Sequence, residues 1–81
     1  MLLANHLARW AVTTTDGTVI TVWADSYSED GGEIVFAALA DASAQEQEEL
    51  DVVGRTPSNP ARVVVALARF PATAVVTVWS S

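Results

Sequence analysis

The chain has 81 residues, of which 51% are hydrophobic, with a formal charge of −6, four arginines, no lysine and no cysteine. A disulfide framework and thiolate chemistry are therefore excluded, and the acidic charge argues against binding to nucleic acid or to an anionic membrane surface. A chain of this length buries only about 60 to 65% of its unfolded surface, so its apolar excess predicts cover by a second copy or another protein.

The expected organisation is one domain over residues 1–81, with an N-terminal extension at 1–8 and an acidic insertion and connection at 41–60. In the extension, Leu3 and Leu7 are four residues apart, which fits a short helical turn packed against a sheet edge. Polar residues interrupt this segment, and no apolar run in the chain reaches the roughly 20 residues that cross a bilayer. We therefore expect a cytoplasmic protein.

The stretch from Trp10 to Asp25 predicts a β-hairpin, because two β-rich arms flank an Asp-Gly pair at 16–17. A two-residue turn would pair Thr15 with Thr18, whereas a three-residue turn with a left-handed glycine pairs Thr14 with Thr18. Only the second register separates an apolar face from a threonine-rich one, so we choose it. Its core side holds Trp10, Val12, Ile20, Val22 and Ala24, and its outer side holds Ala11, Thr13, Val19, Thr21 and Trp23.

Two contrasting segments follow the hairpin. Ser26 to Gly32 is expected to be a loop, because small and acidic residues precede a glycine pair that tolerates positive φ. Ile34 to Ala40 is expected to be a strand, and its lack of polar residues on either side favours a central or covered position in the sheet.

The acidic run from Asp41 to Asp51 breaks this β pattern. Ser43 and Glu46 fit the S-x-x-E capping box, which predicts a helix of about two turns. The glutamates would repel one another along that helix, because no lysine compensates their charge, so a mobile loop also fits. Both interpretations stay open. Val52 to Pro60 contains one glycine and two prolines and is expected to be a long connection.

The C-terminal part predicts two more strands. Arg62 to Phe70 is strongly apolar and ends at a proline, and a single 3₁₀-like turn leaves room for a last strand from Ala74 to Trp79. A strand, one such turn and a closing strand are found at the end of SH3-like small barrels. We therefore expect a mainly β fold of about five strands, either a small antiparallel sheet or a partly open SH3-like barrel, with a short acidic helix in the insertion.

Three short motifs carry a resemblance to a protein family. They are Trp10-x-Val12-Thr13-Thr14-x-Asp16-Gly17, Val22-x-Ala24-Asp25 and Phe70-Pro71-Ala72. In these motifs the chain resembles small uncharacterised proteins of high-GC actinobacteria that open with an aromatic-x-V-T-T-x-D-G hairpin. The resemblance covers about half of the chain and implies no functional residue. It implies the inward placement of Val12, Val22 and Ala24, and a bacterial or phage cytoplasmic setting.

Few side chains suit catalysis or metal binding. His6 is the single histidine, and a nucleophilic triad or a zinc site would need partners that this chain hardly supplies. Asp25, Glu29, Asp30 and Glu33 could offer oxygens to a hard cation, but their spacing does not match a calcium-binding loop. We expect no enzymatic activity, no metal and no cofactor.

The candidate interaction surface consists of Val19, Trp23, Val75 and Trp79, because strand alternation places them away from the core side. Tryptophan is enriched at interface hot spots, and the competing interpretation is that both tryptophans are core residues covered within one folded unit. The acidic residues Glu46, Glu48 and Glu49 form a second candidate segment, facing a protein partner.

Three functional hypotheses follow from these surfaces. The first is a non-enzymatic β-module that self-associates, with a dimer as the expected oligomer, and that can also present its acidic insertion to a protein partner. The second is an acidic regulator or inhibitor, of phage or antitoxin type, that occupies a basic site on a host protein. The third is a small-ligand-binding barrel.

Overall fold

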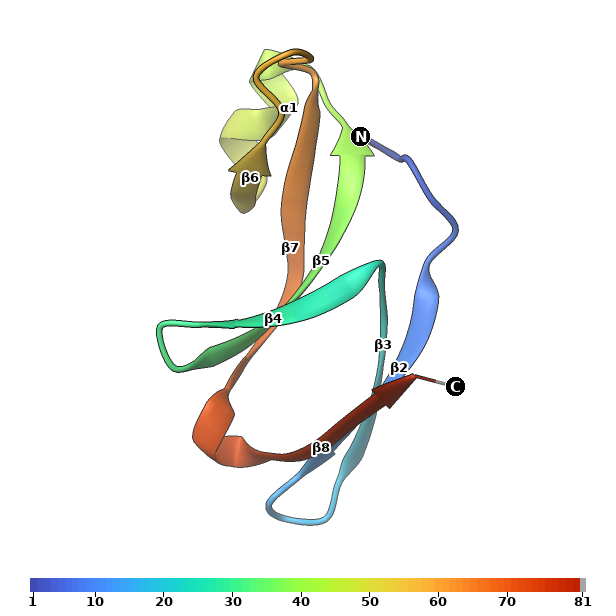
Figure 1. Ribbon diagram of the computed structural model, residues 1–81, viewed down its shortest axis with the longest axis vertical. Coiled ribbons are helices and arrows are strands. Elements are labelled where there is room, and N and C mark those ends of the chain that lie inside the picture. Colours follow the sequence, from blue (N-terminus) through green and yellow to red (C-terminus); the bar gives the residue numbers. More distant parts are fainter. Residues whose placement is uncertain (81) are drawn as a thin grey trace.

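The computed structural model describes residues 1–80, which form two antiparallel β-sheets and one short helix (Figure 1). One sheet has the order β1-β5-β7-β6 with β4 also paired to β5, and the other has the order β3-β2-β8. The elements are β1 (Leu2–Leu3), β2 (Ala8–Thr14), β3 (Val19–Ala24), β4 (Ser26–Asp30), β5 (Glu33–Asp41), α1 (Ala44–Glu49), β6 (Val52–Arg55), β7 (Arg62–Pro71), the 3₁₀ turn η1 (Ala72–Ala74) and β8 (Val75–Ser80). The mainly β prediction is confirmed, and the sheets are not closed into a barrel.

The β2–β3 hairpin has the three-residue turn that the sequence predicts. The Thr14 N–H donates to the Thr18 carbonyl at 2.9 Å, and Gly17 has a φ of 87°. Trp10 consequently pairs with Val22, and Val12 pairs with Ile20. The core side of this hairpin contains the buried residues and the outer side contains the exposed ones, so the chosen register is confirmed.

The segment predicted as a loop at Ser26 to Gly32 is mostly a strand, and that prediction is wrong. Ser26 to Asp30 pair along β5 from Ala37 to Glu33. The glycine pair forms a two-residue hairpin turn in which Gly31 and Gly32 have φ values of 59° and 81°, as a type I′ turn requires. Every residue of β4 is exposed. Its sequence therefore lacks the alternation of apolar and polar residues that indicates a half-buried strand.

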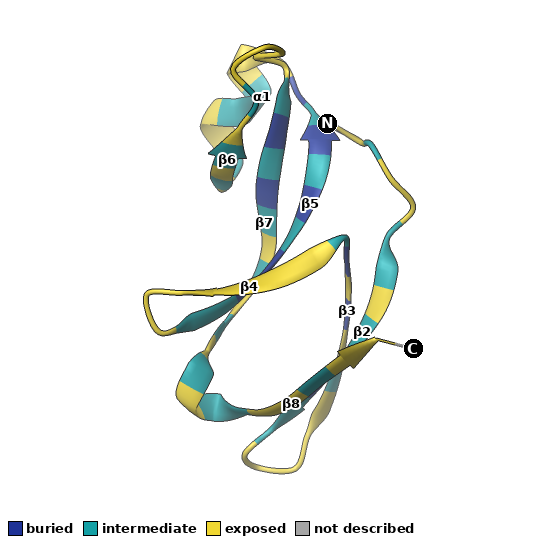
Figure 2. Ribbon diagram, in the orientation of Figure 1, coloured by how far each residue is buried: buried dark blue, intermediate teal, exposed yellow. Residues whose placement is uncertain are grey.

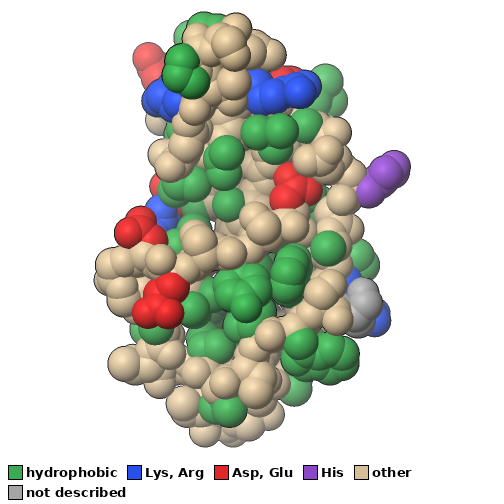
Figure 3. Space-filling view, in the orientation of Figure 1, with side chains coloured by type: hydrophobic (Ala, Val, Ile, Leu, Met, Phe, Trp, Pro, Cys, Tyr) green, Lys and Arg blue, Asp and Glu red, His purple; other side chains and the backbone are tan. Residues whose placement is uncertain are grey.

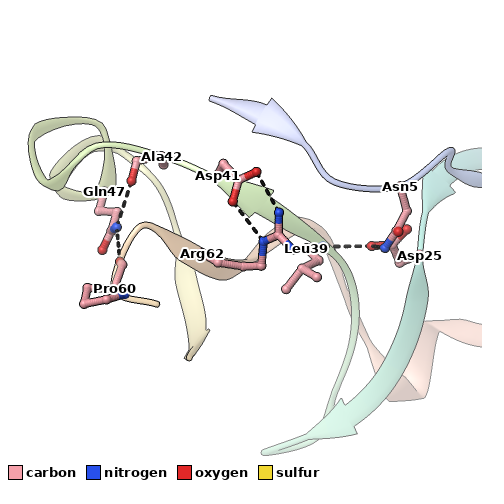
Figure 4. A network of polar contacts seen from close by, with 8 residues as sticks. All are labelled: Asn5, Asp25, Leu39, Asp41, Ala42, Gln47, Pro60 and Arg62. Carbon is pink, nitrogen blue, oxygen red and sulfur yellow. Dashed lines mark hydrogen bonds and ion pairs between the residues drawn. The ribbon is translucent and has the colours of Figure 1, made fainter. Parts of the chain in front are cut away.

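Asp25 joins β3 to β4 where the chain leaves one sheet for the other. Its backbone N–H donates to the Ala37 carbonyl at 2.9 Å. Its carboxylate accepts hydrogen bonds from the Leu39 N–H at 2.8 Å and from the Asn5 amide at 3.2 Å (Figure 4). The Trp10 indole donates to the Ala24 carbonyl just before this junction at 3.1 Å. One continuous stretch of chain, Ala24 and Asp25, is therefore hydrogen-bonded to both sheets.

The capping box predicted for the acidic segment is present. The Glu46 N–H donates to the Ser43 hydroxyl at 3.1 Å, and the Ser43 N–H donates to the Glu46 carboxylate at 3.0 Å. The Gln47 amide then donates to the carbonyls of Ala42 and Pro60, which ties α1 to the segment before it and to the connection between β6 and β7 (Figure 4). The helical interpretation of this segment is confirmed.

Two further segments differ from the expectation. The connection predicted from Val52 to Pro60 begins with strand β6, whose backbone pairs with β7. The N-terminal extension is not a helical turn, because Leu2 and Leu3 pair with β5 as strand β1. Both strands lie at sheet edges and are short, which is why the local pattern gives no strand signal.

The remaining strand predictions are confirmed. β5 and β7 form the longest ladder of the molecule, from Glu33 paired with Pro71 to Asp41 paired with Arg62. The 3₁₀ turn η1 follows Pro71 and leads directly into β8, which crosses to the other sheet and pairs with β2 (Figure 1).

The core is divided into two clusters along a molecule that measures 40 × 25 × 19 Å. The first cluster fills the space between the sheets and contains Val12, Val22, Ala24 and Phe36. The second lies at the α1 end, where Leu50 and Val52 pack against Ala40, Ala42, Val63 and Val65. Figure 2 shows this second set of buried positions along β5 and β7, whereas β4 and much of β8 are exposed.

Replacement of Gly17 tests the bulged turn. Gly17→Ala is expected to lower the free energy of unfolding by about 1 to 2 kcal/mol, because a side chain disfavours positive φ although the space around it is open. Gly17→Asn is the matched control and should cost less, since asparagine tolerates the left-handed region. Urea unfolding measures both, and an alanine variant as stable as the natural chain would contradict this turn geometry.

Candidate functional site

The outer face of the three-stranded sheet is the candidate site. This outer face consists of Arg9, Ala11 and Thr13 on β2, Val19, Thr21 and Trp23 on β3, and Thr77 and Trp79 on β8. Trp23 is 55% exposed and Trp79 is 58% exposed, while Val19 is 62% exposed. The interpretation of these tryptophans as core residues is therefore wrong within one chain, because a substantial part of each side chain faces solvent.

Val75 does not belong to the outer face, and its placement there is a wrong prediction. Thr14 pairs with Val75 and Thr13 pairs with Thr77, so Val76 is an extra residue in a β-bulge. The bulge reverses the alternation, and Val75 packs against the core cluster between the sheets. Val76 is 61% exposed and is the apolar residue of β8 that the prediction missed.

The strands beneath the outer face carry no carboxylate. Arg9 is the single charged residue in β2, β3 and β8, although the chain contains ten acids. Eight of the acids lie between Glu29 and Asp51, with Asp16 in the hairpin turn and Asp25 at the junction. The outer face thus combines exposed tryptophan and valine side chains with threonines, and its one charge is that of Arg9, on a strongly acidic protein.

The acidic segment divides into engaged and open carboxylates. Glu46 completes the capping box and forms an ion pair with the Met1 ammonium. The hydrogen bond from that ammonium, followed by the one from the Ser43 backbone, lowers the pKa of Glu46 to about 2. Glu48 and Glu49 are exposed on α1. Of the three glutamates predicted to face a partner, only these two are directed wholly to solvent.

Arginines neutralise three of the other acids. Arg62 binds Asp41 through two hydrogen bonds of 2.9 and 3.0 Å (Figure 4), and this contact lowers the pKa of the Asp41 carboxyl. Arg69 binds Asp51 at 2.9 and 3.2 Å and Glu33 at 3.3 Å, and the Asp51 pKa is lowered by its contact with Arg69. These pairs join neighbouring elements at the surface and have a structural role.

An open cleft of about 460 Å³ lies between β4 and β6. Its floor is apolar, with Val35, Ala37 and Val64, and the five residues of β4 line one side. Glu29 and Asp30 belong to that side, where the sequence expectation was a loop. The cleft is the place where the small-ligand hypothesis would apply, and the pairing of β4 with β5 creates it.

A second apolar region lies between β4 and β8, where hydrophobic side chains gather in a hollow (Figure 3). The Trp10 and Tyr27 rings meet edge to face with centroids 5.2 Å apart, and Tyr27 lies 5.5 Å from Phe36. These contacts use the aromatic rings for packing within the chain.

The described residues contain no group of three or more His, Cys, Asp and Glu side chains placed to hold a metal ion. Asp25, Glu29, Asp30 and Glu33 are spread over the junction and the β4–β5 hairpin, and Asp25 and Glu33 are engaged with protein groups. None of the helices in residues 1–80 is long and apolar enough to cross a membrane. Comparison with protein-family models, curated proteins and solved structures gives no match.

Acid titration tests the role of Glu46. A carboxyl whose pKa is lowered on folding stabilises the protein above its unfolded pKa, and this stabilisation is lost as pH falls through the folded value. The thermal midpoint is therefore expected to fall between about pH 4.5 and about pH 2. Glu46→Gln keeps the oxygen that accepts the capping hydrogen bond but does not titrate. The difference in thermal midpoint between this variant and the natural chain should therefore shrink toward pH 2. A pH-independent difference, measured by circular dichroism melting, would contradict this role.

Proposed function

We propose that the chain is a non-enzymatic β-module that acts through protein–protein interaction in the cytoplasm and self-associates through its outer face, with a dimer as the simplest assembly. The observation that carries this proposal is the exposure of Trp23 and Trp79 on one sheet face without a carboxylate in the underlying strands. The non-enzymatic part rests on the single histidine and the lack of cysteine in the sequence.

The exposed area is of the size that an interface centre needs. At up to about 250 Å² per tryptophan, the exposed fractions of Trp23 and Trp79 correspond to about 280 Å². An interface of standard size buries about 800 Å² on each partner, so the two rings supply about a third of it. Val19 and the threonines of the outer face surround them and can supply the rim.

The charge distribution favours a second copy as the partner. Two chains of charge −6 repel one another, and the repulsion is strongest where their acids approach. The outer face is the surface at which two copies meet while most of their carboxylates, from Glu29 to Asp51, remain distant on the other sheet and the helix. Self-association through this face therefore has the smallest electrostatic cost.

The test is a sedimentation experiment over micromolar to millimolar concentrations. The natural chain is expected to show a mass that rises with concentration. Trp23→Thr and Trp79→Thr should each weaken association by about 30-fold or more, since truncating an interface hot spot costs about 2 kcal/mol or more. Leu2→Thr removes a 74% exposed apolar side chain from another surface and is the matched control. A natural chain that stays monomeric throughout this range would overturn the proposal.

We propose an acidic regulator as the second candidate function, supported by the open carboxylates of Glu48 and Glu49 on α1. Two adjacent exposed acids on one short helix can enter a basic site on a host protein. Glu46 contributes less to such a contact, because its carboxylate is paired with Met1 and Ser43.

Salt dependence distinguishes this second candidate. Binding to a host protein retained from lysate of the source organism should fall steeply as salt rises, because the contact is made by exposed charges. The double variant Glu48→Gln/Glu49→Gln should abolish retention, whereas Glu46→Gln should preserve most of it. Retention that is unchanged by salt and by the double variant would contradict the regulator hypothesis.

A further inference from the structure

The sizes of the side chains on the outer face indicate how two copies would pack in the proposed self-association. Resting on that proposed function, we propose that a second copy packs face to face on this sheet, with Trp79 of each copy lying over Ala11 of the other. The occupant of the face is thus the same chain, related by a two-fold axis, and the contact is isologous.

The size of the side chains varies across the outer face. The central strand β2 carries Arg9, Ala11 and Thr13 on the outer face, and the two flanking strands carry Trp23, opposite Arg9, and Trp79. Ala11 pairs directly with Trp79 on one side and with Thr21 on the other. The smallest side chain of the outer face therefore lies beside one of its largest, at the centre of the sheet.

This arrangement is self-complementary. A two-fold axis between Ala11 and Trp79 sets each Trp79 indole over the small Ala11 side chain of the other copy. The two Trp79 rings then lie next to each other, where offset or edge-on contact between aromatic rings is favourable. Packed sheets lie about 10 Å apart with interdigitated side chains, and a large ring opposite an alanine fits that spacing.

The competing arrangement is edge pairing through β8. This strand pairs with β2 and has no second neighbour among the described strands, and it carries no charge that would block another strand. The bulge at Val76 interrupts its regular backbone, however, and the exposed rings of Trp23 and Trp79 would stay uncovered. Face-to-face packing covers the Trp79 rings of both copies, because β2 and β8 of one copy lie over β8 and β2 of the other.

Enlargement of the Ala11 side chain tests this geometry. Ala11→Leu is expected to weaken dimerisation by about 30-fold or more in sedimentation, because each copy inserts additional methyl groups into a packed contact. Ala44→Leu adds the same groups to exposed helix α1 and should leave dimerisation unchanged. In a mixture of ¹³C-labelled and unlabelled natural chains, isotope-filtered NMR should show a contact between the Ala11 methyl group and the Trp79 indole of the other copy.

The outcomes separate this inference from the proposed function. A natural dimer without that intermolecular contact overturns the geometry, even if Ala11→Leu fails to fold. Dimerisation that survives Ala11→Leu but is lost in Val76→Lys assigns the interface to the β8 edge, in which case self-association stands and the geometry fails. A natural chain that is monomeric at every concentration overturns the proposed function itself.

Discussion

The hydrogen bonds at Asp25 are the constraint on which the rest of the structure depends. The carboxylate and the N–H of Asp25 bind the end of β3 to β5. The Trp10 indole, on β2, donates a hydrogen bond to the preceding carbonyl, that of Ala24. The chain can therefore turn from one sheet into the other without leaving these backbone groups unpaired, which would be costly next to the core. Close to this junction, Phe36 of β5 packs with Val22 and Ala24 of β3 in the cluster between the sheets.

The two sheets are unequal in their cover. Leu50, after α1, and Val52, at the start of β6, pack on one end of the β5–β7 ladder, and salt bridges of Arg62 and Arg69 lie along its surface. The three-stranded sheet has the core on one side and no other element of the described chain on the outer face. The face with the exposed tryptophans is thereby separated from most of the carboxylates of this small protein.

Local rules predicted the elements whose signal is contained in neighbouring residues. The register at Gly17 and the helix start at Ser43 followed from turn and capping chemistry within a few positions. β4 was missed because its polar, exposed residues resemble a loop, and it is a strand only through its pairing with β5. Val75 was misplaced because the bulge arises from pairing with Thr13 and Thr14, about sixty residues away in sequence. The residues next to Val75 in sequence give no sign of it.

The division of the core into two clusters gives the molecule an uneven resistance to opening. The cluster between the sheets contains Phe36 and valines, with aromatic rings packed around it. The cluster at the other end is made of alanines and valines, and α1 buries none of its own residues against it. Detaching α1 and β6 exposes less apolar surface than separating the sheets, so local unfolding of this end requires less free energy than global unfolding. The acidic end is thus the labile part of the fold, and the tryptophan-bearing sheet belongs to the part that unfolds last.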